Sequence, residues 1–223
     1  MRNAPVFSQE KPQWFFGGHR ISEKLPFYRG ALSSSMEPEN QALCDFLQER
    51  LFPAKVSLCL DIHSGFGSKD RLWFPYAKTK NPFPYFVEAY AFRQLMNKAY
   101  PHNFYAVEPQ SLQYTTHGDL WDYLFDLHYR TKKEDQFFMP LTLEMGSWKW
   151  VRKNPKQIFD LLGVYNPILP HRRARVLRDH KTFLDFLHRV IQSEEWISMD
   201  NEQRDIYRFE ALNLWYGGTN SGF

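Results

Sequence analysis

Two short segments constrain the fold more than any other part of this chain, because each joins an apolar strand pattern to one reactive side chain. In SLCLDIHSGFG (residues 57–67), leucine and isoleucine alternate with other residues until the run reaches His63 and a glycine-containing turn. In PLTLEMGSW (residues 140–148), leucines alternate in the same way up to Glu144. This alternation predicts two strands, which we interpret as buried. Because ligands of open α/β sheets bind outside the carboxyl ends of strands, His63 and Glu144 are expected to face one crevice.

Helical and strand patterns alternate along the rest of the chain. Apolar stripes predict helices over about 34–52, 84–99, 118–129 and 171–192, and a short helix that opens at Asn154-Pro155. Further strands are predicted at 71–77 and 102–110, whereas residues 1–33 have no sustained period and are interpreted as an ordered loop. The alternation predicts an α/β fold, layered α/β/α, with a central mixed sheet.

Composition excludes several classes of protein. The net charge is +3, from 28 basic and 25 acidic residues, and this balance argues against a nucleic-acid partner. The basic run HRRARVLRDH (residues 171–180) is interpreted as the solvated face of a helix. Cys44 and Cys59 are expected to be small core residues rather than a disulfide framework. No apolar run approaches the roughly 20 residues of a membrane span. The first residues lack the apolar core of a signal peptide, so the chain is expected in the cytoplasm if Met1 is its true start.

His63 and Glu144 are the residue types that a zinc hydrolase requires. Such a site uses about three protein ligands, leaves one position open for water, and needs a carboxylate that takes a proton from that water. His63 suits the role of ligand and Glu144 the role of general base. Taken singly, His63 is also compatible with a satisfied turn histidine, and Glu144 with a surface carboxylate at the end of a strand.

Four segments in order resemble motifs of the zinc carboxypeptidases of the carboxypeptidase A type. They are EPENQAL (37–43), DIHSG (61–65), YTTHGDLWDY (114–123) and LTLEMG (141–146). The resemblance implies that His63 is the third zinc ligand, that Glu144 activates the zinc-bound water, and that Tyr114 closes over the substrate. Asp122 follows Tyr114 at the family's spacing. Trp121 occupies a position that lines the family's specificity pocket, where a tryptophan indicates an apolar or narrow pocket.

The first residues extend this resemblance. MRNAP is similar to the end of the family's Asn-Arg-Asn segment, with Arg2 at the position of the arginine and Met1 at the position of the first asparagine. In the family, that arginine binds the free carboxylate of the substrate. A guanidinium suits the task because its planar fork binds a carboxylate through two hydrogen bonds.

The chain also departs from the family's pattern. The family's other two zinc ligands form a His-x-x-Glu motif upstream of the arginine, and no such motif occurs in this sequence. We therefore expect zinc as the cofactor, with His63 present and two ligands upstream of Met1. On this interpretation the fold is N-terminally incomplete. Residues 1–192 are the C-terminal part of a catalytic domain, residues 193–223 are an extension with a mobile tip, and the chain alone does not bind zinc tightly.

The remaining histidines offer no clear substitute for the missing ligands. His19 and Glu23 have a helical spacing of four residues, but nearby glycines and a proline disfavour a helix there. His117 lies in the loop after Tyr114, where it is placed to touch a substrate. The others are expected on the protein surface: His128, His171, His180 and His188.

The function expected first is a zinc-dependent metallocarboxypeptidase, which removes C-terminal residues from peptides. One alternative is a zinc amidohydrolase of the N-acyl amino acid deacylase type, whose ligand set is similar. In both cases the substrate carries a free carboxylate. The other alternative is a non-catalytic remnant or binding domain, which the missing ligands favour.

Overall fold

The computed structural model describes residues 22–25, 28, 30–31, 35–65, 67–160 and 162–217. Arg2 and His19 lie outside the described residues, as does the tip of the predicted extension from residue 218 onward.

Helices and strands occur close to where the sequence predicts them. In chain order the elements are α2 (Pro38–Arg50), β1 (Val56–Ser64), β2 (Arg71–Phe74), α3 (Phe86–Ala99), β3 (Ala106–Pro109), the 3-10 helix η1 (Gln110–Leu112), α4 (Leu120–Thr131), β4 (Phe137–Met145), α5 (Trp148–Lys153), the 3-10 helix η2 (Pro155–Phe159), α6 (Pro170–Val190) and α7 (Asn201–Trp215). The short helix expected at Asn154-Pro155 is η2, and α7 lies within the segment expected to be an extension.

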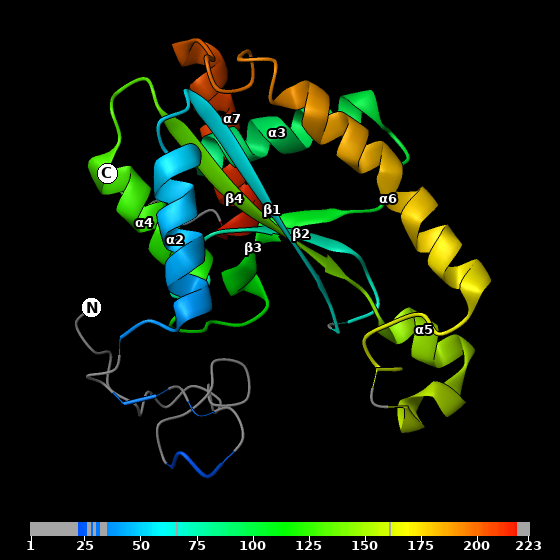
Figure 1. Ribbon diagram of the computed structural model, residues 1–223. Helices are drawn as coiled ribbons and strands as arrows, with labels where there is room; N and C mark the ends of the chain where they lie inside the picture. The colour runs from blue at the N-terminus through cyan, green and yellow to red at the C-terminus, as the bar shows by residue number, and fades with distance from the viewer. Residues whose placement is uncertain are drawn as a thin grey trace.

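The four strands form one mixed sheet in the order β1-β4-β2-β3 (Figure 1). β1 and β4 are parallel, β2 and β3 are parallel, and β2 runs antiparallel to β4. β1 and β4 therefore end at the same edge of the sheet, where β2 begins. β4 is the last of these four strands in chain order and still occupies a central position, so the side chains at its end have strands on both sides.

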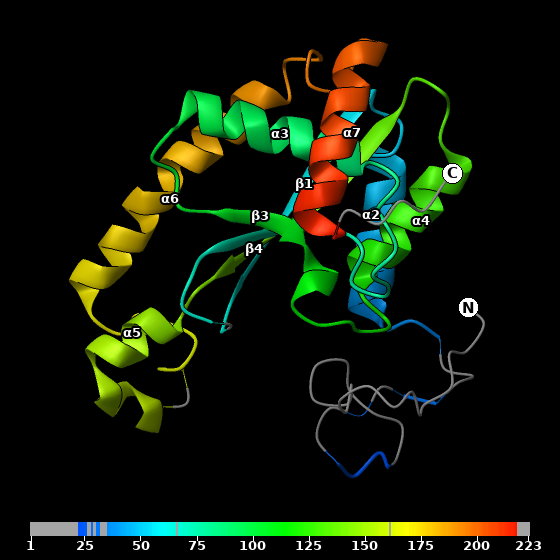
Figure 2. The ribbon, with the colours of Figure 1, turned by 180° about the vertical axis from the view of Figure 1, so that it is seen from behind.

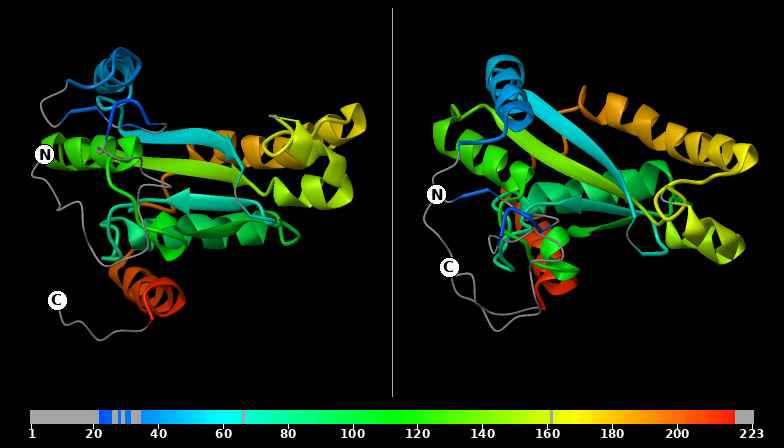
Figure 3. Two further views of the ribbon diagram at one scale, coloured as in Figure 1. Left: turned by 90° about the horizontal axis from the view of Figure 1, so that it is seen from below. Right: turned by 60° about the horizontal axis from the view of Figure 1, so that its bottom comes forward.

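Helices cover the sheet from more than one side, in agreement with an α/β fold and compatible with α/β/α layering. α2 and α4 lie together, and α3 packs against α7 (Figures 1 and 3). Phe138 of β4 packs against Phe52 and His128, with ring centroids 5.4 Å apart in both pairs. Phe74 of β2 packs against Trp215 of α7 at 4.8 Å. None of the helices in the described part of the chain has the length and apolar character that a membrane span requires.

α7 contributes to the hydrophobic core rather than lying apart from it. Ala211 and Trp215 are buried, and the Nε1–H of Trp215 donates to the carbonyl of Val107 at 3.0 Å. Burial of a tryptophan with its polar N–H satisfied is a strong anchor. Residues 201–215, part of the predicted extension, therefore form part of the packed domain.

β1 differs from the sequence prediction because it is an edge strand. On its far side no strand pairs with it among the described residues, and Ile62 is 56% exposed. Val56, Leu58 and Leu60 are half-buried. β4, by contrast, is buried along most of its length. The alternating pattern reports that one face of a strand is apolar, but it does not report how many neighbours the strand has.

Two histidines that were expected on the surface are buried. His128 of α4 is 1% exposed and packs edge-on to Phe52, with ring centroids 4.9 Å apart. His180 of α6 is also buried, and its Nδ1 lies 2.7 Å from the hydroxyl of Tyr105. Both predictions were wrong because a histidine counts as polar in a helical pattern, whereas its ring is apolar enough to fill a core position.

Candidate functional site

The structure brings His63 and Glu144 together. They are register partners on the parallel strands β1 and β4, so their side chains project from the same face of the sheet at the carboxyl ends of both strands. Glu144 is 6% exposed because β4 is central, whereas about half of the His63 side chain is exposed because β1 is an edge strand. The pair therefore consists of a buried carboxylate beside an accessible imidazole.

Asp61 holds His63 in place. It lies two residues earlier on β1 and so faces the same side of the sheet. Its Oδ2 is 2.8 Å from Nε2 of His63 and accepts a hydrogen bond of 2.6 Å from Nε1 of Trp121. Trp121, which was predicted to line a specificity pocket, thus also supports the carboxylate that orients the histidine. The signal for Asp61 was available in the sequence, since an Asp-x-His pair on a strand shares one face.

The bond between Asp61 and His63 has two electrostatic consequences. It raises the pKa of His63 against the opposing effect of burial, with further contributions from the charges of Asp61, Glu144 and Asp119. Burial raises the pKa of Asp61, but the hydrogen bonds from His63 and Trp121 outweigh it and lower the pKa overall. A metal ligand must be neutral imidazole. When Nε2–H donates to Asp61, the lone pair of Nδ1 remains available for a metal ion. Donation of the other ring N–H to a carboxylate is the usual second contact of a metal-binding histidine.

Tyr114 lies within electrostatic reach of Glu144. It follows η1 in the chain, its ring meets that of Trp73 edge-on at 5.9 Å, and its hydroxyl accepts from Nε2 of Gln110 at 3.3 Å. Burial raises the pKa of Tyr114, the bond from Gln110 lowers it, and the charges of Glu144 and Asp119 raise it further. The phenol is therefore kept protonated and able to donate a hydrogen bond.

The carboxylate of Asp122 has a structural role, because it is buried and bonded to backbone groups and is not exposed to a substrate. Its carboxylate is 3% exposed and accepts hydrogen bonds of 2.8 to 3.1 Å from the backbone N–H groups of Ala77 and Lys78. Burial raises its pKa to about 7, the charge of Asp119 adds to the rise, and the bonds from Ala77 and Lys78 oppose it. These contacts fasten the start of α4 to the loop after β2. Asp119 caps the helix by accepting from the N–H of Asp122 at 2.9 Å.

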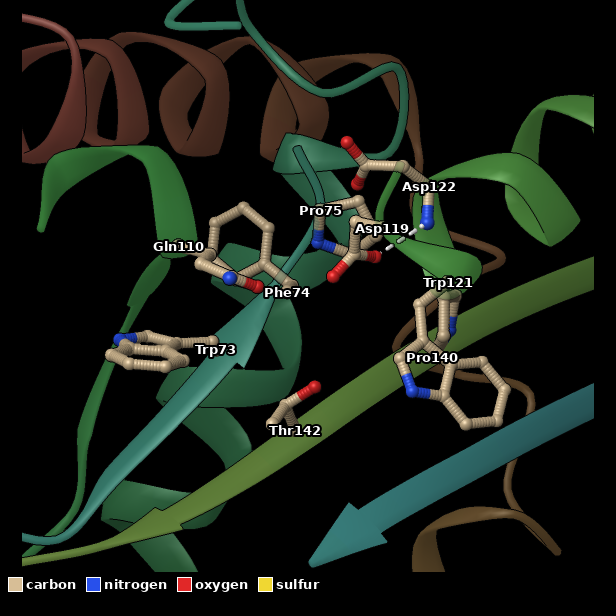
Figure 4. Close-up of a pocket in the computed structure, with 9 residues that line it drawn as sticks. All are labelled: Trp73, Phe74, Pro75, Gln110, Asp119, Trp121, Asp122, Pro140 and Thr142. Carbon is tan, nitrogen blue, oxygen red and sulfur yellow. Dashed lines mark hydrogen bonds between the residues drawn. The ribbon is translucent and has the colours of Figure 1, made fainter. Parts of the chain in front are cut away.

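A small pocket lies on the face of the sheet that carries Glu144, where β2 and β4 diverge (Figure 4). Its lining residues are Trp73, Phe74, Pro75, Gln110, Asp119, Trp121, Asp122, Pro140 and Thr142. Thr142 precedes Glu144 by two residues and shares its face. The cavity volume is about 10 Å³, which is enough for one water molecule and too small for a substrate side chain.

The turn after Glu144 is fastened to the turn after His63. The buried carboxylate of Asp70 accepts from the N–H of Gly146 at 2.8 Å and from Nζ of Lys149 at 2.6 Å. The N–H of Trp148 donates to the carbonyl of Gly67 at 3.0 Å. A Cβ at position 146 would lie 2.5 Å from the backbone nitrogen of Lys69, so only glycine allows the two turns to approach this closely. The sequence analysis did not identify Asp70.

Arg71 lies next to Glu144 in the sheet but already forms an ion pair. It is the register partner of Glu144 on β2, and its guanidinium lies 2.5 Å from Glu108. Glu108 also accepts from Trp73 and Gln113, at 3.3 and 2.9 Å. This cation is therefore held within the β2–β3 side of the sheet, and the sequence analysis missed both Arg71 and Glu108.

The described residues contain single donor groups of the kinds that bind metal ions. Among them, no three His, Cys, Asp or Glu side chains are placed to hold a metal ion together. His63 is one suitable donor, with Asp61 as its outer partner. Glu23, considered above as a substitute ligand with His19, is exposed. The set of donors present is thus one imidazole and one neighbouring buried carboxylate.

No protein-family model matches the chain, and no similar protein was found among the curated proteins or the solved structures. The resemblance to zinc carboxypeptidases therefore depends on the sequence motifs alone.

Proposed function

We propose that this chain contains the general base and one zinc ligand of a zinc carboxypeptidase-type hydrolase, which removes C-terminal residues from peptides. The observation that carries the proposal is the register pairing of His63 with Glu144 at the ends of parallel strands. The electrostatic proximity of Tyr114 adds to it. These are the three residues to which the motifs assign metal binding, proton transfer and substrate closure.

The chemistry of the site follows from its own side chains. Glu144 accepts a proton from the attacking water and returns it to the leaving amine. Asp61 and Trp121 hold His63 in a fixed orientation, and Tyr114 presents a protonated hydroxyl to the substrate. His63 would hold a zinc ion together with two ligands from outside the described residues, and the zinc would supply a polarised water of lowered pKa. Arg2 is proposed to bind the terminal carboxylate of the substrate.

Hydrolysis assays separate this proposal from its alternatives. The 223-residue chain is incubated with zinc and three substrates: a peptide with a free C-terminal carboxylate, the same peptide amidated, and an N-acyl amino acid. The same assay is run on a polypeptide extended upstream of Met1 to supply the two further ligands. We expect zinc-dependent cleavage of the free-acid peptide alone by the extended polypeptide, and no appreciable cleavage by the 223-residue chain. Cleavage of the N-acyl amino acid alone would identify an amidohydrolase. Retention of activity on the amidated peptide would remove Arg2 from the site.

Variants of the extended polypeptide assign the roles. Glu144→Gln is expected to lower kcat by about 100- to 10,000-fold with zinc retained, because the amide keeps the shape of the carboxylate but accepts no proton. His63→Ala is expected to lose zinc itself. Glu134→Gln, at an exposed position before β4, is the matched control and should leave both quantities unchanged. Zinc binding by neither the chain nor its extended form, with no cleavage, would identify a non-catalytic domain.

A further inference from the structure

The segment from residue 148 to 178 forms a lobe at the end of the molecule. It comprises α5, η2, the following turns and the N-terminal part of α6, and it lies beyond the carboxyl end of β4 (Figures 1 and 2). Two arginines bind its parts together. Arg172 donates to the carbonyl of Trp150 at 3.1 Å, and Arg173 donates to the carbonyl of Pro167 at 3.0 Å. We call this segment the basic lobe.

Positive charge is concentrated in the basic lobe. It contains eight Lys and Arg residues and one acidic residue, Asp160, although the whole chain has a net charge of only +3. The rest of the chain is therefore net acidic. Lys149 is paired with Asp70 and Arg175 with Asp179, whereas Arg152, Lys153 and Lys156 are exposed. A local surplus of this size produces a positive surface potential that the overall charge conceals.

Large apolar side chains are exposed among these cations. Phe159, at the end of η2, is 91% exposed, and Leu162 is 62% exposed. Trp148, Ile158 and Tyr165 are exposed as well. A pocket of about 280 Å³ is lined by Asp160, Leu162, Ile168 and Arg173 among others. Clusters of exposed apolar groups rimmed by charge mark interaction surfaces.

We propose that the basic lobe docks on an anionic lipid surface. Arg and Lys side chains attract anionic headgroups, while aromatic and aliphatic side chains enter the boundary between headgroups and acyl chains. Phe159 and Leu162 are the inserting side chains, and Lys153 and Lys156 lie close to them in the chain. Ile158 and Leu162 favour lipid over nucleic acid, because they have no ring on which a base can stack, whereas aromatic and aliphatic side chains alike enter a lipid boundary.

Vesicle co-sedimentation of the full chain tests the proposal. Vesicles consist of phosphatidylcholine alone or of phosphatidylcholine mixed with phosphatidylserine. The chain should sediment with the mixed vesicles only, and added salt should weaken binding. Lys153→Glu with Lys156→Glu should reduce affinity by about five-fold or more for each charge. The separate variant Phe159→Ala with Leu162→Ala should also reduce affinity for the mixed vesicles, but without changing the salt dependence of binding.

Matched controls lie outside the basic lobe. Lys80→Glu with Lys133→Glu changes the net charge equally at exposed positions, and Phe209→Ala removes an exposed ring from α7. Both should bind as the unmodified chain does. Equal sedimentation with both kinds of vesicle, no sedimentation, or equal losses in lobe and control variants would each overturn the proposal. Binding to single-stranded RNA in place of vesicles would overturn it in favour of a nucleic-acid surface.

Discussion

The carboxylate of Asp70 accepts a hydrogen bond from the backbone N–H of Gly146, and in this way the loop between β1 and β2 holds the turn that follows Glu144. The same carboxylate is ion-paired with Lys149. One buried side chain thus fixes the start of β2 and the turn after β4 relative to each other, so the position of the turn that follows Glu144 depends on a residue that belongs to neither strand.

Asp70→Asn is expected to lower the free energy of unfolding by about 2 kcal/mol, because it weakens charge-assisted hydrogen bonds at a buried position. Denaturant unfolding measures the change. Asp179→Asn is the control, since Asp179 forms an exposed pair with Arg175 across one helical turn and should change stability by less than about 0.5 kcal/mol. Equal effects of the two substitutions would show that Asp70 does not fasten the turns.

His128 is expected to make stability depend on pH. Burial lowers its pKa to about 4, with a smaller contribution from Lys132, and neither ring nitrogen has a hydrogen-bond partner among the described residues. The unfolded chain takes up the proton near a pKa of about 6.5. The contribution of His128 is therefore fully present above about pH 6.5 and is lost as the pH falls from there to about 4, by up to about 3 kcal/mol.

Replacement of the ring removes this dependence. His128→Leu should flatten the fall in unfolding free energy between near-neutral and acid pH, as measured by urea titration at several pH values. His188→Leu, at an exposed position on α6, is the matched control substitution. An unaltered slope in His128→Leu would mean that folding does not lower the pKa of His128.

Trp215 is expected to anchor α7. Trp215→Ala should cost about 3 to 5 kcal/mol, because it opens a cavity next to Phe74 and leaves the Val107 carbonyl without its donor. Trp215→Phe should cost less, since the ring remains. Leu214→Ala, exposed on the same helix, serves as the control. If a chain that ends before α7 unfolds with an unchanged free energy, α7 is an extension, as the sequence suggested.

No strand in the described part of the chain pairs with the outer edge of β1, and Ile62 is expected to promote self-association through this edge. An exposed apolar edge strand is a template for pairing with another chain. Ile62→Lys should reduce light scattering at high protein concentration and change stability by no more than about 0.5 kcal/mol. Ile206→Lys adds the same charge on the exposed face of α7 and should leave scattering as it was. Scattering that falls equally in both variants would indicate a general effect of charge.

Local patterns predicted the strands that carry His63 and Glu144, because alternation over a few residues is a local property of the chain. The order of the strands was not predictable in the same way, since each pairing joins segments far apart in the sequence. For the same reason the edge position of β1, and with it the exposure of Ile62, was missed.

The candidate site was predictable only where chemistry follows from residue type. His63, Glu144 and Tyr114 stood out by their motifs. Asp70 and Arg71 lie in a polar turn and at the start of a short strand, where a charged residue is ordinary, and only the fold shows what they contact. Asp122 drew notice through its spacing, whereas its contacts with Ala77 and Lys78 are visible only in three dimensions.

The central position of β4 has a consequence for the order in which the sheet is completed. β1 and β2 precede β4 in the chain but do not pair with each other, because β4 lies between them. During synthesis, β2 and β3 can pair while β1 has no partner among these strands until residues 137–145 have emerged. Pairings that close such long loops form slowly. Insertion of β4 therefore joins the two parts of the sheet and brings Glu144 beside His63 in the same event.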